Sequence, residues 1–152
     1  MFSTQLVHRI LDASPVARLA QIDEHGGPQA LPFVFFRSGN ALWSPIDGKP
    51  KKNARLDRIE WIRKRPDVLV LIDHYDGDWS RLWWVKLFGE ADVVGESVTG
   101  WELAVEGLGQ KYPQYNEIPM FTGVPTMIRI DISRWKSWSA AGDAAIAGQF
   151  GL

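Results

Sequence analysis

Residues Leu82–Val94, with the sequence LWWVKLFGEADVV, decide the fold of this chain of 152 residues. Side chains two residues apart lie on the same face of a β-strand. The segment Leu82–Phe88 carries large apolar groups on both faces, although a barrel needs only one apolar face. We therefore expect the second face to meet a partner. The residues expected to share one face are Trp83, Val85, Leu87, Ala91 and Val93.

The rest of the chain contains further strand signals, most of them separated by short turns. Val68–Ile72 (VLVLI) is apolar on both faces, which is typical of a central buried strand. About six strands, mostly joined by hairpins, predict a mainly β (α+β) fold, an antiparallel barrel with appended helices. The other strands are predicted at Val16–Ile22, Gln29–Arg37, Ala41–Pro45 and Pro125–Trp138.

Helices are predicted at Ser3–Leu11, in the basic segment that ends at Pro66, and at Ser97–Lys111. Residues 1–140 are expected to form one domain, because no repeat or linker divides them. The last twelve residues, 141–152 (AGDAAIAGQFGL), are rich in Ala and Gly, and we expect a loosely packed C-terminal tail.

Composition excludes several classes of protein. The 45% hydrophobic and 23% charged residues are typical of globular domains, and no apolar run approaches the length of a membrane span. The absence of cysteine excludes disulfides, thiolate catalysis and thiolate-bound metals, and it is compatible with a cytoplasmic location. A pI near 6.3 argues against general nucleic-acid binding.

The segment Lys49–Arg65 (KPKKNARLDRIEWIRKR) holds eight of the 17 Lys and Arg residues against two acids. Lys51, Arg55 and Arg58 are spaced i, i+4, i+7, so in a helix they share one face. A strand and a Gly/Pro turn precede the segment, and a helix that begins after such a turn favours an anion at its positive end. The segment is therefore either a site for the phosphate of a cofactor or a solvated basic helix.

Eight tryptophans are unusual in a chain of this length. Trp79, Trp83 and Trp84 cluster in DWSRLWWVK, while Trp135 and Trp138 lie near the end of the last predicted strand. Large aromatic side chains near polar groups fit a dimer interface or a site for a flat ring. Plain core packing is the alternative for each of them.

Other chemistries find little support. His8, His25 and His74 are scattered without the spacing of metal ligands, so we expect no metal site. His74 lies beside Asp73 and Asp76, which could orient it, but a structural or solvent-facing role is preferred. The chain has neither the G-x-S-x-G pattern of a nucleophile elbow nor the G-x-G-x-x-G pattern of a Rossmann site.

A series of motifs resembles one family. The motifs are ARLAQID, PFVF after a Gly-Gly-Pro turn, DGKPK, LIDHYDGDWSRLWWV, KYPQY and DISRWKSWS, and they extend from about Val16 to Ala140. They resemble the split-barrel flavin/deazaflavin oxidoreductases, in the branch related to pyridoxamine-phosphate oxidase whose members use the deazaflavin coenzyme F420. The resemblance implies a six-stranded antiparallel split β-barrel (the FMN-binding split barrel) that forms a homodimer, with two cofactor sites at the interface.

The resemblance also implies a set of site residues. The basic helix would hold the cofactor phosphate and its anionic tail, with Ser44 beside the ring or ribityl chain. Residues 32–35 would run under the ring, and residues 79–81 would reach the site from the other subunit. Arg81 is the candidate to stabilise developing negative charge, with a surface salt bridge as its alternative. The expected cofactor-binding residues are Pro32, Phe33, Val34, Phe35, Ser44, Lys49, Lys51, Arg55, Arg58, Trp79, Ser80, Arg81 and Trp84.

The function implied is hydride transfer between a reduced deazaflavin and a small electron-poor substrate, and we expect deazaflavin to bind more tightly than FMN. An FMN-binding oxidoreductase of the same fold is the nearest alternative, and a non-catalytic carrier or sensor of the cofactor is another. The chain departs from the pattern at Trp61, where relatives often carry Asn. Trp61 either removes a polar contact to the cofactor or packs against the barrel.

Overall fold

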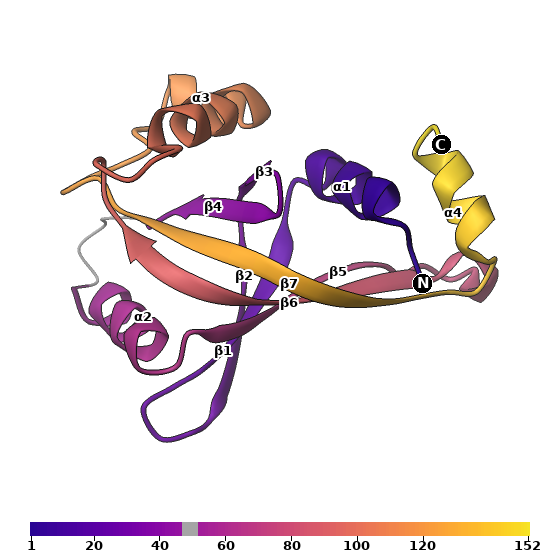
Figure 1. Ribbon diagram of the computed structural model, residues 1–152, viewed down its shortest axis with the longest axis horizontal. Coiled ribbons are helices and arrows are strands. Elements are labelled where there is room, and N and C mark those ends of the chain that lie inside the picture. The colour runs from indigo at the N-terminus through magenta and orange to yellow at the C-terminus, as the bar shows by residue number, and fades with distance from the viewer. Residues whose placement is uncertain (47–51) are drawn as a thin grey trace.

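In the computed structural model, the backbone is described for residues 1–46 and 52–152, and side chains for residues 1–46 and 57–152. Within these ranges, seven strands form one antiparallel sheet in the order β2-β1-β5-β6-β7-β4-β3 (Figure 1). The prediction of a mainly antiparallel α+β fold is confirmed. The strands are β1 (Ala17–Ile22), β2 (Pro28–Phe33), β3 (Phe36–Ser38), β4 (Ala41–Pro45), β5 (Asp67–His74), β6 (Trp83–Val94) and β7 (Met127–Ser139).

The seventh strand arises because the predicted strand Gln29–Arg37 is interrupted. The backbone N–H of Phe35 donates to Tyr112 Oη at 3.0 Å rather than to a neighbouring strand. The chain turns at Val34 and Phe35, so β2 and β3 lie at opposite edges of the sheet. A side chain nearly eighty residues away thus breaks a run that looks continuous in sequence.

In the described part of the chain, four helices pack around the sheet: α1 (Thr4–Ala13), α2 (Lys52–Lys64), α3 (Trp101–Lys111) and α4 (Asp143–Gln149). Ser3 caps α1 by accepting a hydrogen bond from the Leu6 N–H at 3.1 Å. α3 begins four residues later than predicted, at Trp101, because Gly100 adopts a left-handed φ of 95° before it. Figure 1 shows α2 at one end of the sheet and α4, with the N-terminus, at the other.

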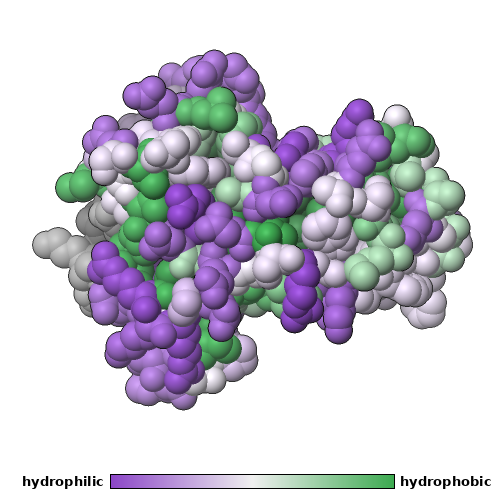
Figure 2. Space-filling model, viewed as in Figure 1, coloured by the Kyte–Doolittle hydropathy of each residue, from purple (hydrophilic) through white to green (hydrophobic). Residues whose placement is uncertain are grey.

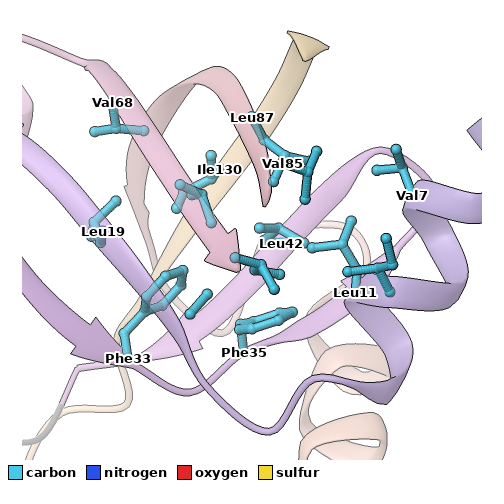
Figure 3. Packing of buried hydrophobic residues seen from close by; sticks show 14 of the residues in the cluster. Val7, Leu11, Leu19, Phe33, Phe35, Leu42, Val68, Val85, Leu87 and Ile130 are labelled. Carbon is cyan, nitrogen blue, oxygen red and sulfur yellow. The ribbon is translucent and has the colours of Figure 1, made fainter. Parts of the chain in front are cut away.

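The main core fills the concave side of the sheet. α1 contributes Val7 and Leu11, which meet Leu42 and Val85 from the strands (Figure 3). Ile59 and Ile62 bring α2 against the same core. A second cluster lies under α3, where Trp101 stacks on Phe121 at 5.4 Å between ring centroids.

The C-terminal segment differs from the expected loose tail. Residues 143–149 form α4, and Ile146 is 0% exposed within the main core. Phe150 packs edge-on against Trp83, and the N-terminal amine pairs with Asp143 at 3.0 Å. The Ala-rich composition that suggested a loose segment suits a short helix with one buried apolar contact.

Lys111 at the end of α3 joins three parts of the fold. Its Nζ donates to the carbonyls of Leu11 at 3.1 Å and Phe35 at 3.0 Å, and it lies 3.8 Å from the Phe35 ring centre. Burial lowers the pKa of Lys111 from 10.5 to about 8. A neutral amine still has two N–H donors, so both carbonyls keep their partner after deprotonation.

The lowered pKa predicts how stability changes with pH. Between pH 8 and 10.5 the unfolded chain binds a proton at Lys111 that the folded chain does not, so this group makes folding more favourable as pH rises. Burial raises the pKa of Tyr112, so the comparison is restricted to pH 8–10. We expect chemical denaturation to show a steeper rise of the free energy of unfolding for the native protein than for Lys111→Met. Equal slopes would contradict this assignment.

Candidate functional site

The half of the predicted site on α2 centres on Arg58. Its side chain is largely buried, and its Nε has no hydrogen-bond partner among the described residues. Burial lowers the pKa of Arg58, since the charged guanidinium is partly removed from water. A buried N–H group without an acceptor is costly, and an anion beside Nε would offset that cost. The arrangement therefore fits the phosphate of a cofactor.

The other predicted cations of this segment are not placed. Lys49 and Lys51 lie outside the described residues, and so does the side chain of Arg55, although Arg55 belongs to α2. Arg63, further along α2, is exposed and lies 3.3 Å from Glu60. Among the described side chains of α2, Arg58 is thus the cation directed inward.

Trp61 contacts the turn of the β1–β2 hairpin. Its Nε1 donates to Glu24 in the hairpin turn, and Arg65 approaches Gly26 in the same turn. Arg58 and Trp61 are three residues apart and share one face of α2. Arg65, one residue past the end of α2, continues the spacing, since its N–H donates to the Trp61 carbonyl at 2.8 Å. This face meets the end of β1, and Arg58 lies one helical turn further from the hairpin tip than Trp61.

β1 carries a polar residue that sequence reasoning missed. Gln21 is only 2% exposed, and neither its Oε1 nor its Nε2 has a partner among the described residues. Gln21 shares the inward face of β1 with Ala17 and Leu19. The signal in the sequence was a polar residue at an inward position of an alternating strand.

The segment expected under the cofactor ring is divided between core and surface. Phe33 and Phe35 are buried in the main core, with ring centroids 5.4 Å apart. Val34 packs against the second cluster, and only Pro32 is exposed. Ser44 is buried on β4 opposite Ile128. The two phenylalanines therefore stabilise the barrel, and a ligand could contact this segment through Pro32 and the backbone.

The second half of the predicted site is the turn between β5 and β6. The 3₁₀ turn η1 (Trp79–Arg81) is capped by Asp78, whose Oδ1 accepts from the Ser80 N–H at 3.1 Å and from Ser80 Oγ at 2.6 Å. Trp79 is 69% exposed, which is unusual for so large an apolar side chain. Arg81 is also mainly exposed, with its Nε 3.6 Å from Asp76 Oδ2.

His74 takes part in the same network. Its Nε2 lies 2.8 Å from Asp76 Oδ2, and its ring stacks on Trp83 at 6.4 Å between centroids. The hydrogen bond from His74, together with the Asp78 amide and the charge of Arg81, holds the pKa of Asp76 below its usual value. The ionised carboxylate orients both His74 and Arg81. The D-H-Y-D spacing suggested this orientation, which the sequence could not establish.

The two halves are far apart within one chain. β5 follows α2 directly and ends at His74, so its eight residues separate the two ends of the sheet by about 25 Å. Trp84, whose partners across the sheet are Asp73 and Trp138, belongs to the half with η1. The structure thus brings together the residues around Trp79 and Arg81, but it does not bring them to Arg58.

Two negative findings concern the described residues. No group of three or more His, Asp or Glu side chains in the described part of the chain is arranged to hold a metal ion. None of the helices described here is long and apolar enough to cross a membrane.

The comparisons with known proteins identify the fold. No protein-family model matches the chain, and no curated protein matches it. A FAD-binding protein from Mesorhizobium loti is similar, with 21% identity, a TM-score of 0.65, and coverage of 90% of this chain and 94% of that one. A candidate pyridoxamine 5′-phosphate oxidase from Listeria innocua is 21% identical, with a TM-score of 0.60 and coverage of 88% and 95%.

The haem storage protein HutZ from Vibrio cholerae is similar too, with 12% identity, a TM-score of 0.68 and coverage of 91% and 95%. The chain therefore has the split-barrel fold of these proteins. The fold occurs with flavin and with haem, so it does not by itself select the ligand.

Proposed function

We propose that this protein is a redox enzyme that binds a flavin-type cofactor, with FMN as its first candidate. The observation that carries the proposal is Arg58, a largely buried cation whose Nε has no acceptor among the described residues. The similar solved structures of a FAD-binding protein and a candidate pyridoxamine 5′-phosphate oxidase support a flavin on this fold.

Arg58 would hold the cofactor phosphate, together with Lys49, Lys51 and Arg55 on the same segment. Arginine binds phosphate oxygens with charge-assisted hydrogen bonds, which are stronger in a partly buried site. Pro32 and Ser44 would lie along the ring and its ribityl chain. When bound, a flavin supplies the hydride chemistry, so the protein contributes position, a dry environment and charge.

Arg81 is the candidate for charge stabilisation near the substrate. Asp76, kept ionised by its hydrogen bonds, holds Arg81 at 3.6 Å and would fix the direction of its guanidinium. A fixed cation stabilises negative charge that develops on a substrate, because it needs no reorganisation during the reaction. The exposed ring of Trp79 would cover one side of the substrate.

We further propose that the protein is a homodimer whose cofactor sites use residues of both subunits. The half of the site with Trp79 and Arg81 lies about 25 Å along β5 from the α2 end of the sheet, further than one flavin extends from phosphate to ring. A second copy can supply the missing half at each site. In one copy alone, the residues for the cofactor phosphate and the residues for the substrate would lie too far apart to serve the same site.

A deazaflavin cofactor is the second candidate, and the basic segment favours it. Its extra carboxylates would need more cations than an FMN phosphate does. Arg63 pairs with Glu60, and Arg65 faces the β1–β2 hairpin. Two of the cations beyond those that an FMN phosphate needs therefore have other contacts. This observation makes FMN the first choice.

Absorbance spectra and titrations of the purified protein test the proposal. We expect FMN to bind to the protein in a saturable manner. Quenching of flavin fluorescence measures the binding. Deazaflavin and haem are titrated in parallel, because the fold occurs with several ligands. Tighter binding of deazaflavin would reassign the cofactor, whereas binding of haem alone would refute a flavin enzyme. Binding without turnover of any acceptor would indicate a carrier.

A further inference from the structure

Gln21 is a buried polar residue for which packing alone gives no reason. It is the last inward-facing residue of β1, and its side chain is 2% exposed. Its Oε1 and its Nε2 both lack a hydrogen-bond partner among the described residues. A buried amide without partners destabilises a fold, and an apolar side chain at this position would avoid that cost. A glutamine here therefore indicates a role other than packing.

The helix that covers this end of β1 is α2, which contacts the strand directly. Trp61 of α2 donates to Glu24 in the hairpin turn, and this contact fixes where the helix lies along β1. Arg58 lies three residues, about 4.5 Å, further from the hairpin tip. That step leads from the turn back along β1, where Gln21 is the last inward residue. Arg58 therefore lies over the part of β1 that carries Gln21.

Buried polar atoms without a partner gather at this place. In the described part of the chain there are four such side-chain atoms, and three of them belong to Gln21 and Arg58. The fourth, Arg129 Nε, has the Asp131 carboxylate 3.6 Å away. Figure 2 shows mainly hydrophilic residues over the part of the molecule where Figure 1 draws α2 and the β1–β2 hairpin. Polar groups on that surface meet water, whereas Gln21 and Arg58 Nε need a partner inside.

The unpartnered atoms of the two side chains are complementary. Arg58 Nε carries one N–H donor, and Gln21 Oε1 is an acceptor. The two atoms form no direct hydrogen bond. A single water molecule can accept from Nε and donate to Oε1, and buried waters commonly join polar groups in this way. Such a bridge would satisfy both atoms without moving the helix or the strand.

We propose that Gln21 positions Arg58 for the cofactor phosphate through one buried water molecule. The bridge would hold the Nε of the guanidinium toward β1 and leave its terminal nitrogens available to phosphate oxygens. A guanidinium that is already held in place loses less conformational freedom when the phosphate binds, which strengthens binding. The inference rests on the proposed function and adds to it a residue that does not itself touch the cofactor.

Titrations with FMN and with riboflavin, which lacks the phosphate, test this role. Gln21→Leu removes the acceptor, and we expect it to raise the dissociation constant of FMN about three- to tenfold, as for the loss of one neutral hydrogen bond. The dissociation constant of riboflavin should stay unchanged, because riboflavin offers Arg58 no phosphate. Gln21→Met, which keeps the length of the side chain, is the second variant and should behave in the same way.

Gln29→Leu is the matched control. Gln29 lies directly opposite Gln21 in the pairing of β1 with β2, but it is exposed, and its Nε2 donates to Asp23 at 2.9 Å. The same substitution at this position should leave the dissociation constants of FMN and riboflavin unchanged. Circular dichroism verifies that each variant is folded.

Urea denaturation of the protein without cofactor tests the pairing of Gln21 with Arg58 directly. Gln21→Leu is made in the native chain and in Arg58→Ala. In the native chain the substitution leaves the Arg58 N–H without its bridge, whereas in Arg58→Ala there is no such N–H. We therefore expect Gln21→Leu to shift the denaturation midpoint less favourably in the native chain than in Arg58→Ala. FMN affinity should also be non-additive, with Gln21→Leu adding little to the effect of Arg58→Ala.

Three outcomes would overturn the inference. Equal midpoint shifts in the two backgrounds would show that Gln21 and Arg58 do not interact. Equal losses of FMN and riboflavin affinity in Gln21→Leu would show a general disturbance of the site. Unchanged FMN affinity in Gln21→Leu, when the native protein binds FMN, would exclude the positioning role. A native protein that binds no FMN would refute the proposed function, and the midpoint shifts then decide alone whether Gln21 acts on Arg58.

Discussion

Replacing Ile146 by Ala is expected to lower the free energy of unfolding by about 2–5 kcal/mol, the usual cost of removing most of a buried Ile side chain. Ile146 is 0% exposed and belongs to the main core, although it lies in the last ten residues of the chain. Truncation leaves a cavity in a part of the core that α4 closes together with Phe150. Urea denaturation measures the change.

Gln149→Ala is the control for this prediction, because Gln149 lies on the same helix and is exposed. Its substitution should change the free energy of unfolding by less than about 0.5 kcal/mol. Similar small effects in both variants would mean that α4 contributes little to the fold and that the C-terminus behaves as a loose tail.

Replacing Arg58 by Ala is expected to weaken FMN binding about ten- to one-hundred-fold, as for the loss of a charge-assisted hydrogen bond of roughly 1.5–3 kcal/mol. The stability of the protein without cofactor should stay the same or rise. The reason is that Arg58 Nε is buried and unpartnered among the described residues, so its removal relieves a desolvation cost.

Arg63→Ala is the matched control for Arg58→Ala. Arg63 is an exposed arginine of the same helix, and it forms an ion pair with Glu60. Its loss should change FMN affinity little, apart from the weak and salt-screened effect of one distant charge. Equal affinity in the two variants would show that α2 is a solvated basic helix. A large loss of stability in Arg58→Ala would instead show a structural role for the guanidinium.

The sequence predicted much of the sheet because its signals are local. The alternation in Leu82–Val94 gave β6 to within one residue, and Pro66 correctly marked the end of α2. The break between β2 and β3 could not be predicted, because it depends on Tyr112, which is distant in sequence from Phe35. α4 was missed because a single buried residue, Ile146, produces no periodic pattern.

In the candidate site, too, the sequence predicted some features and could not predict others. The charge and spacing of the basic segment drew attention to Arg58, and the family resemblance drew attention to Arg81. The structure adds the buried Nε of Arg58 and the carboxylate partner of Arg81. Phe33 and Phe35 could not be separated from ligand-facing aromatics, because sequence does not show which side of a strand meets the core. The distance between the two halves follows from the length of β5, which begins beside α2 and ends at the turn with Trp79 and Arg81.

The strand order also determines when the protein can fold during synthesis. β1 pairs with β5, about fifty residues later, and β4 pairs with β7, which begins more than eighty residues after it. Pairings of such high sequence separation make folding slow, because a long loop must close before its contacts form. β4 and β3 have no place in the sheet until β7 has left the ribosome. An emerging chain therefore exposes unpaired strand edges until β7 has been synthesised.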